Sequence, residues 1–479
     1  MRPSAARIGA LTFAMQEQKT VAMVRFSIAI APVASPLAMM AMATVCIELF
    51  AGCRGDSSPT STPVAIVDAA PPVEPAEAAR TAALGAKNMY DATSSADVGV
   101  EADVRAANDF AFKFYAHKKD TAGNVMLSGT SLRRALSAAY LGARGETASE
   151  MARALLLSTD ANKASAAAKA EGAAWQRAQG TAPTSAKLIV ADRLWVEKSL
   201  TLEAGYTKAV ESALDASVAP LDFVHASEEA RTTINGWVAE KTAGQIKELL
   251  LAGFVDANTR LVITNAIYFK GKWALPFSKS ATHDEAFTSA PGKTMTTPTM
   301  HATGTYKLAS ASGAKALEMR YEAGDLAMLV ILPNDQNGIG KLENDVAKNG
   351  IDTWTTNLAT TRVAVTLPKF TFDFGSSMNN ALKALGMKAA FTPNADFSGI
   401  AKPQGNDRLY VSNVVHKTWV AVDEEGTEAA AATGVGTRTT GMTIGPVAEF
   451  RADHPFLFFI RDTKSGRILF IGRFTEPKS

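Results

Sequence analysis

Cysteine is nearly absent from this chain of 479 residues. Its two cysteines, Cys46 and Cys53, both lie near the N-terminus. No disulfide can therefore hold a folded domain built from the residues that follow. Because the cysteines are confined to this first segment, they carry no information about the redox state around such a domain.

The chain also lacks an excess of charge of either sign. It has 49 lysine and arginine residues against 47 aspartate and glutamate residues, which gives a formal net charge of +2. Nucleic-acid-binding domains concentrate basic residues on one face or stripe. The balance found here gives no electrostatic case for a nucleic-acid partner.

The motifs of common hydrolases and nucleotide-binding enzymes are missing as well. There is no G-x-S-x-G and no H-E-x-x-H, and the six histidines are scattered. Ser312 and Lys315 form an S-x-x-K, but neither S-D-N nor K-T-G accompanies it. The glycine-rich run 434–441 follows no strand–helix nucleotide unit. We therefore expect a protein that is not an enzyme and that has no metal site and no cofactor.

An apolar segment, residues 21–51, lies close to the N-terminus behind several basic residues and is interrupted by two prolines. It suits a cleaved signal better than a permanent membrane helix. It leads into LFAGC, residues 49–53. This motif resembles the end of a bacterial lipoprotein signal, in which the cysteine, here Cys53, becomes lipidated. The alternative is an ordinary signal peptide with an incidental cysteine.

Residues 54–103 are rich in proline, alanine, serine and threonine. This composition is typical of a flexible tether. We therefore expect a signal peptide with a lipobox-like end over 1–53, a tether over 54–103 and a folded domain over 104–479. The protein is expected to be exported, as a lipoprotein of the bacterial cell envelope or as an extracellular protein. It would meet a membrane only through its lipid anchor.

The remaining residues have a globular pattern, in a chain that is 47% hydrophobic and 20% charged. Apolar residues at helical spacing come first, as over 104–115, and Thr147 and Glu150 have the spacing of a capping box ahead of a further helix. Apolar runs typical of strands come later, as over 261–269 and 408–422. Helices early and strands late predict the α+β class.

The segment DEEGTEAAAAT, residues 423–433, is the most informative in the chain. It begins with three carboxylate residues, 423–425, and a glycine, Gly426. The side chains that follow are no larger than threonine, apart from Glu428. In an extended chain one face would be small and uncharged, and would carry Thr427, Ala429, Ala431 and Thr433. Small side chains lose little entropy when they become ordered, so such a segment can be a loop that later slides into a sheet. An alanine-rich linker is the alternative.

Several motifs, in order along the chain, resemble those of the serpin family. They are LGARGET (141–147), NAIYFKGKW (265–273), LPKF (367–370), LKALGM (382–387), ADFSGI (395–400), EEGTEAAAAT (424–433) and FRADHPFLFFIRD (450–462). The match covers about residues 104–474. The resemblance implies the serpin fold, with three β-sheets, about nine helices and an exposed reactive loop.

The resemblance also implies a function, the suicide inhibition of serine and sometimes cysteine proteases. A target protease cuts the loop and is held as an acyl-enzyme, while the cut loop enters the largest sheet as a new strand. The expected partner is therefore a target serine protease, and the expected state of the chain is a monomer. A serpin that binds other molecules without inhibiting proteases is the alternative.

The resemblance assigns a hinge and a reactive bond. The hinge residues are Glu424, Glu425, Gly426, Thr427, Glu428, Ala429, Ala430, Ala431, Ala432 and Thr433. Thr427 would be the first side chain to enter the sheet. Counting seventeen residues from Glu424, as is usual in the family, places the reactive bond at Thr440–Gly441. A loop shorter by two residues would place it at Arg438–Thr439 and make trypsin-like proteases the targets.

The resemblance further implies a polar cluster, the shutter, where the central strands part. Its matching residues are Ser128, Ser131, Asn265 and His416, and Trp273 matches the aromatic residue at the breach, where the loop enters. Gly129 stands where the family has proline. Because glycine lacks the fixed φ of proline, we expect it to loosen the start of the helix that follows.

Overall fold

The computed structural model describes residues 100–182, 186–402, 408–427 and 446–477, which lie within one compact unit, Pro75–Ser479. Its helices are α2 (Val100–Ala116), α3 (Gly129–Gly142), α4 (Gly145–Leu155), α5 (Ala161–Gln179), α6 (Ala204–Leu214), α7 (Phe223–Lys241), α8 (Ile339–Asn349), α9 (Asp352–Thr355) and α10 (Asn379–Ala384), with two short 3-10 helices, Lys279–Ala281 and Ala389–Phe391. In these ranges no helix is both long and apolar enough to cross a membrane.

The strands of the same described residues form two hydrogen-bonded sheets. They are β1 (Val125–Leu127), β2 (Lys187–Glu197), β3 (Ser217–Leu221), β4 (Leu261–Lys272), β5 (His283–Ala290), β6 (Lys293–Ala311), β7 (Ala314–Arg320), β8 (Leu326–Pro333), β9 (Ala359–Pro368), β10 (Phe370–Ser377), β11 (Asn413–Val422), β12 (Gly426–Thr427), β13 (Ala448–Arg451), β14 (Phe456–Asp462) and β15 (Ile468–Phe474). Helices precede most strands, as the α+β prediction requires.

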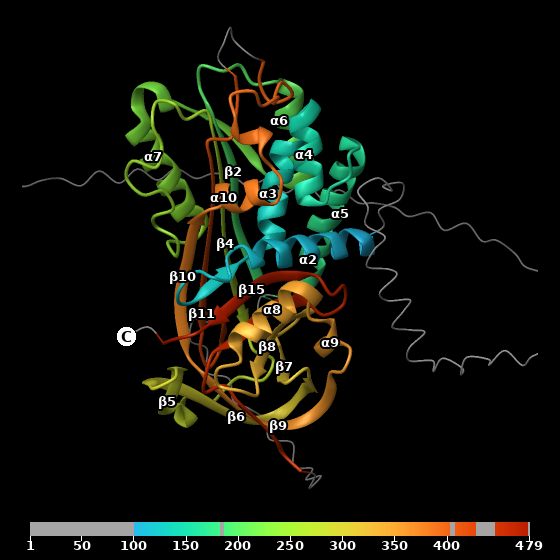
Figure 1. Cartoon of the computed structure of the whole chain (residues 1–479), viewed down its shortest axis with the longest axis vertical. Helices are drawn as coiled ribbons and strands as arrows, with labels where there is room; N and C mark the ends of the chain where they lie inside the picture. Colours follow the sequence, from blue (N-terminus) through green and yellow to red (C-terminus); the bar gives the residue numbers. More distant parts are fainter. Residues whose placement is uncertain (1–99, 183–185, 403–407, 428–445, 478–479) are drawn as a thin grey trace, which may run out of the picture. The chain divides into compact units, whose positions relative to one another are not determined.

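The six-stranded sheet has the order β10-β11-β12-β4-β2-β3 and is covered on both faces. Helix α3 packs on one face of β2 and β4, and α7 packs on the other face, as Figure 1 shows. Alternate residues of β4 divide accordingly. Ile263 joins the large core cluster, whereas its neighbour Val262 joins the smaller cluster around Phe223 of α7. Burial on both faces explains why β4 reads as a continuous apolar run.

The second sheet has the order β1-β15-β14-β8-β7-β6-β9-β13, with β5 paired to β6. Strand β6 is 19 residues long. Its first part pairs with β5 and β9, and its last residues pair with β7. The three sheets that we expect are therefore present as one six-stranded sheet and two groups of strands that share β6. The serpin-type α+β fold is confirmed.

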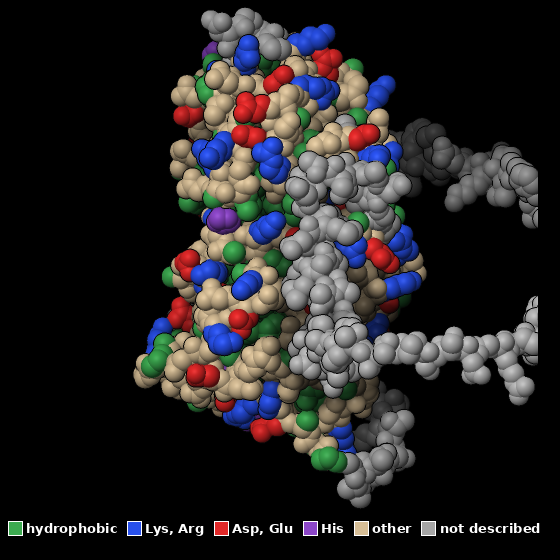
Figure 2. All heavy atoms as spheres, turned by 45° about the vertical axis from the view of Figure 1, so that its right-hand side comes forward, with side chains coloured by type: hydrophobic (Ala, Val, Ile, Leu, Met, Phe, Trp, Pro, Cys, Tyr) green, Lys and Arg blue, Asp and Glu red, His purple; other side chains and the backbone are tan. Residues whose placement is uncertain are grey.

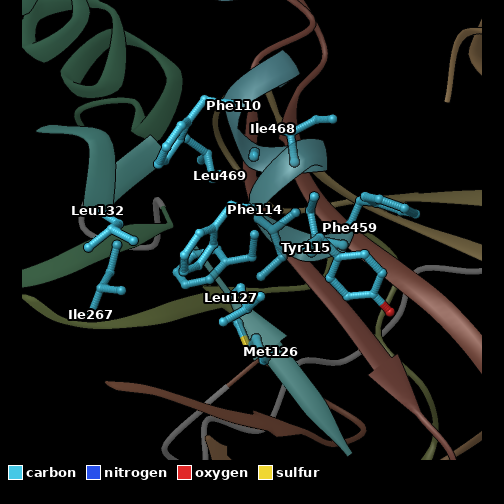
Figure 3. Packing of buried hydrophobic residues seen from close by; sticks show 14 of the residues in the cluster. Phe110, Phe114, Tyr115, Met126, Leu127, Leu132, Ile267, Phe459, Ile468 and Leu469 are labelled. Atoms are coloured by element: carbon cyan, nitrogen blue, oxygen red, sulfur yellow. The ribbon is translucent and has the colours of Figure 1, made fainter. Parts of the chain in front are cut away.

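Helix α2 and the strands meet in the core drawn in Figure 3. Phe110 and Phe114 of α2 are fully buried, and their rings stack at a centroid distance of 5.8 Å. Leu132 of α3, Ile267 of β4 and Leu469 of β15 belong to the same cluster. This core joins the six-stranded sheet to the second sheet, so strand β4 rests on a rigid support.

Two local predictions are wrong. Thr147 does not cap a helix, because it lies inside α4, where its Oγ1 accepts a hydrogen bond of 2.9 Å from the backbone of Asp396. The carboxylate of Glu150 accepts hydrogen bonds from the backbone N–H groups of Lys388 and Ala389, far along the chain, instead of from its own helix. The strand expected over 408–422 is shorter and begins only at Asn413.

Glycine in place of the family's proline does not prevent α3 from starting at Gly129. The helix begins at this residue and is capped by Ser128, whose side chain accepts a hydrogen bond from the Ser131 backbone N–H. A Cβ atom at position 129 would lie 2.5 Å from Cα of Ala111 in α2. Glycine is therefore required here by the close approach of two helices.

The surface carries both signs of charge. On the face drawn in Figure 2, lysine and arginine side chains are interspersed with aspartate and glutamate side chains. This distribution matches the balanced composition and shows no extended basic region on that face.

Candidate functional site

The hinge begins inside the six-stranded sheet. Gly426 and Thr427 form the short strand β12, which pairs antiparallel with β11 through Val422 and with β4 through Lys272 and Gly271. A Cβ atom on Gly426 would lie 2.0 Å from the carbonyl oxygen of Gly271. Only glycine permits this approach, so Gly426 is the residue that lets the chain turn back between the two strands.

Thr427 is fully buried in this position. The hydroxyls of Thr427 and Tyr321 are 2.8 Å apart and share a hydrogen bond. The ring of Trp273 stacks on Tyr321 at 4.7 Å. The indole N–H of Trp273 donates to the carbonyl of Asp423, and its backbone N–H donates to the carbonyl of Glu425. The breach aromatic predicted from the sequence therefore holds the chain that leads into β12.

Two lysines bind the hinge carboxylates. Nζ of Lys369 donates to both oxygens of Glu424, at 3.1 and 2.9 Å, and Nζ of Lys279 donates to Glu425 at 2.6 Å. Burial acts to raise the pKa of Glu424, but the hydrogen bonds to its carboxylate, those from Lys369 foremost, and the charge of Lys369 together outweigh burial and leave this pKa below its usual value. Glu424 is therefore ionised at neutral pH and fixes the start of the hinge.

The four predicted shutter residues form one buried network. The Ser128 backbone N–H donates to Nε2 of His416 at 3.0 Å, and Nδ1 of His416 lies 2.5 Å from Oδ1 of Asn265. Nδ2 of Asn265 donates to Oγ of Ser131 at 2.7 Å. Because a backbone N–H can only donate, Nε2 must accept, and Nδ1 must carry the proton that is donated to Asn265. Burial lowers the pKa of His416 to about 3, so the ring is neutral.

Sequence reasoning missed a fifth member of this network, Asp192 of β2. It lies opposite Asn265 in the β2–β4 ladder, and Nδ2 of Asn265 donates to its carboxyl oxygen. Burial raises the pKa of Asp192 to about 7. A carboxyl residue in the middle of a largely apolar strand, β2, was the signal in the sequence, but only the strand register shows which group it meets.

The shutter crosses the boundary between β11 and β4. These strands pair in parallel from Asn413 beside Val262 to Trp419 beside Tyr268, and His416 is the direct partner of Asn265. Strand β12 sits at one end of this boundary, where β11 and β4 have already separated. A strand that extended β12 would have to break the His416–Asn265 hydrogen bond.

The structure therefore brings Ser128, Ser131, Asn265 and His416 together and places Trp273 apart from them, at the hinge. The remaining predicted site residues lie outside the described residues; they are Cys53, Glu428, Ala429, Ala430, Ala431, Ala432, Thr433, Arg438, Thr439, Thr440 and Gly441. Tyr321 and Lys369 are further contributors that the sequence did not single out, since their role depends on contacts with the hinge.

Comparisons with known proteins agree with this arrangement. Residues 105–477 match the family model described as Serpin (serine protease inhibitor). Among curated relatives, leukocyte elastase inhibitor of Bos taurus is 37% identical, over 78% of this chain and 98% of its own length. A serpin-like protein of Thermococcus kodakarensis is 38% identical, over 78% of this chain and 86% of its own length. Antithrombin-III of Mus musculus is 34% identical, over 78% of this chain and 81% of its own length.

Solved structures give the same result. Serpin48 of the insect Tenebrio molitor matches with a TM-score of 0.71 and 30% identity, over 78% of this chain and 98% of its own. Uncleaved ovalbumin matches with a TM-score of 0.69 and 28% identity, over 78% and 99%. With the family model covering well over half of the sequence, this chain belongs to the serpin family.

Proposed function

We propose that this chain is a suicide inhibitor of serine proteases, with cysteine proteases as a second class of target. The observation that carries the proposal is the position of Thr427, already paired between β4 and β11. The residues that follow it, 428–433, have the small alternating face that a further strand needs. The names of two relatives, leukocyte elastase inhibitor and antithrombin-III, support the same function.

The register of β12 indicates how insertion would proceed. Thr427 pairs with Gly271 on β4 and with Val422 on β11. Thr433 is six residues after Thr427, and Asn265 and His416 are six residues before those two partners. Continued antiparallel pairing would therefore bring Thr433 between Asn265 and His416. Its side chain would lie on the same face as that of Thr427, toward the shutter.

The chemical step belongs to the protease. Its serine oxygen forms an ester with the carbonyl carbon of Thr440, the amide bond to Gly441 breaks, and the new amine at Gly441 takes up a proton. Insertion of the freed segment then has to outrun hydrolysis of the ester. This reactive bond, and the alternative Arg438–Thr439, rest on the hinge count in the sequence.

Mixing the chain with a panel of serine proteases tests this function. We expect a complex that survives SDS on a gel and a released C-terminal peptide that begins at Gly441 in mass spectrometry. A peptide that begins at Thr439 would move the reactive bond to Arg438. A non-inhibitory serpin, the alternative, would give no SDS-resistant complex with any protease in the panel, even with a protease that cuts its loop.

We further propose that the chain is an exported monomeric lipoprotein of the bacterial type, anchored through Cys53. The LFAGC motif and the tether-like composition of residues 54–103 support this proposal. Membrane fractionation of a Cys53→Ala variant tests it, with Cys46→Ala as the matched control. We expect only Cys53→Ala to leave the membrane fraction. Unchanged fractionation of both variants would exclude a lipid anchor at Cys53.

A further inference from the structure

Two histidines and a glutamate converge on one face of β5 and β6, just after the segment whose Phe277 and Lys279 contact the hinge carboxylate residues. His283 and Glu285 are two residues apart on β5, so their side chains share a face. His283 pairs across the ladder with Thr299, and His301 lies two residues beyond Thr299 on β6, diagonal to His283. No sequence motif links these three residues. The register of the two strands brings them together.

The donor atoms are close enough to share one ion. Nε2 of His283 lies 3.0 Å and Nε2 of His301 lies 3.1 Å from the same oxygen, Oε1 of Glu285. One ligand atom from each of the three residues lies within 4.8 Å of the others. Bonds of about 2.0–2.2 Å from a tetrahedral metal ion to nitrogen and oxygen give donor separations of this order. The separations of the three donor atoms are therefore compatible with one shared ion.

The second oxygen of Glu285 is held separately. Oε2 of Glu285 accepts a hydrogen bond of 2.5 Å from Arg451 of β13, and Nε of Arg451 lies 3.3 Å from the carboxylate of Asp453. This leaves Oε1 on the side of the histidines. The carboxylates of Glu285 and Asp453 outnumber the guanidinium of Arg451. A cation that binds while both imidazoles are neutral therefore does not meet a net positive charge. Such hydrogen-bonded support of a ligating carboxylate is usual at metal sites.

The histidines are positioned unequally. On His301, Nδ1 lies 3.4 Å from the hydroxyl of Thr366, whereas Nε2 is inaccessible to solvent and makes no hydrogen bond. The His283 ring stacks on that of His301 at 4.4 Å with an interplanar angle of 6°. Two parallel rings cannot both hold one ion in their own planes, so one ring must turn. His283 is the one free to do so, since its side chain is 63% exposed.

We propose that His283, Glu285 and His301 bind a divalent transition-metal ion of the zinc class. Two imidazoles and one carboxylate favour such an ion over Ca²⁺ or Mg²⁺, which take oxygen ligands. Three protein ligands leave a fourth position for water or for a group of another molecule. The proposal rests on these three residues and not on the loop mechanism, so its failure would leave the proposed inhibition untouched.

Titration calorimetry of the full chain with Zn²⁺ tests the site. We expect the double variant His283→Ala/His301→Ala to bind one Zn²⁺ fewer than the wild type. The matched control is His117→Ala/His225→Ala, which removes two exposed imidazoles elsewhere and should bind as many ions as the wild type. Any contribution of Cys46 and Cys53 to Zn²⁺ binding is the same in all these proteins and cancels in the difference.

Two further measurements separate ion binding from misfolding. Zn²⁺ should raise the unfolding midpoint of the wild type and not that of the His283→Ala/His301→Ala variant, whose midpoint without Zn²⁺ should equal that of the wild type. Glu285→Gln should weaken Zn²⁺ binding at least tenfold. An equal number of bound ions in the wild type and the double variant would overturn the proposal, as would an equal loss in the control.

Discussion

Thr427 is the residue at which the hinge already belongs to the sheet. It is fully buried, and its hydroxyl shares a hydrogen bond with Tyr321. A Thr427→Arg variant would place a guanidinium in this position, and burying a charge without a partner costs several kcal/mol. Strand β12 should then open and insertion should slow, so that the protease completes hydrolysis and leaves. We expect cleavage at the same bond with loss of the SDS-resistant complex.

A neighbouring substitution provides the control for that prediction. Glu428→Arg introduces the same side chain one residue later, on the opposite face of an extended strand. Continued pairing would place it beside Lys270, which is exposed. We expect this variant to form more complex than Thr427→Arg when the two are compared by gel at equal protease concentration. Wild-type trapping by Thr427→Arg would mean that the protein does not work by hinge insertion.

Asp192 makes the stability of the fold depend on pH. Burial raises the pKa of this carboxyl from 3.8 to about 7. The folded state then binds more protons than the unfolded state between about pH 4 and pH 7, so this group lowers stability as pH rises through that window. We therefore expect the unfolding midpoint of Asp192→Asn, measured relative to that of the wild type, to be higher at pH 8 than at pH 5.

Denaturant unfolding at the two pH values measures this effect. Each unit of pKa shift corresponds to about 1.4 kcal/mol. The loss of this pH dependence of the unfolding free energy should therefore be readily measured. Asp120→Asn removes a carboxyl that is 88% exposed and serves as the control for lost charge. If Asp192→Asn changed the midpoint equally at both pH values, Asp192 would not be a group that titrates in this window.

Among the elements, β12 sets the register for the strand that is to follow. Extension of its pairing brings Thr433 between Asn265 and His416, where a side-chain hydroxyl can replace the hydrogen bond that is lost between them. Thr433→Val keeps the shape and removes the hydroxyl. Leaving a buried polar group unsatisfied costs about 1–3 kcal/mol. We therefore expect Thr433→Val to require more inhibitor per trapped protease.

Thr433→Ser tests whether the hydroxyl is the cause, because it removes only the methyl group. The stoichiometry of inhibition, measured by titrating protease activity, should be close to that of the wild type for Thr433→Ser and higher for Thr433→Val. Equal stoichiometry for all three proteins would show that insertion does not bring Thr433 to the shutter in this register.

The sequence predicted these elements unevenly. The apolar period of α2 and the continuous apolar run of β4 identify both elements, since burial leaves a direct mark on residue type. Thr147 has the spacing of a cap but lies inside α4, because the helix begins before it. The alternation after Glu424 suggests a mobile strand, yet nothing in it shows that Thr427 is already paired. That fact depends on Gly271 and Tyr321, which lie more than a hundred residues away in the sequence.

The same limit applies to the polar clusters. Ser128, Ser131, Asn265 and His416 could be identified as a group only through the family resemblance, since they come from three separate segments, the start of α3, β4 and β11. Asp192, His283 and His301 were not predicted to take part in any site. Their neighbours are set by cross-strand register. A single sequence does not fix this register between strands that are distant along the chain.

In the whole molecule, insertion of the loop would replace one strand pairing, that of β11 with β4, by two pairings with the inserted strand. Strands β11 and β4 pair in parallel along seven residue pairs, from Asn413–Val262 to Trp419–Tyr268. A strand inserted between them would pair antiparallel with both, as β12 already does. Antiparallel pairing is slightly more stable per residue than parallel pairing. We therefore expect the form before cleavage to be held by a barrier and not by the lowest free energy.

This exchange predicts that cutting the loop stabilises the chain. A protease that cuts within residues 434–441 and is not trapped should leave a chain whose loop has entered the sheet. One additional ladder of about seven hydrogen bonds, at about 0.5–1.5 kcal/mol each, amounts to several kcal/mol. We expect the thermal unfolding midpoint of the cut chain to exceed that of the intact chain, in calorimetry or circular dichroism. The cut Thr427→Arg variant should gain less, because its first inserted residue fits poorly. If the cut and intact wild-type chains unfolded at the same temperature, the loop would have stayed outside the sheet, and simple competitive inhibition would explain any loss of protease activity.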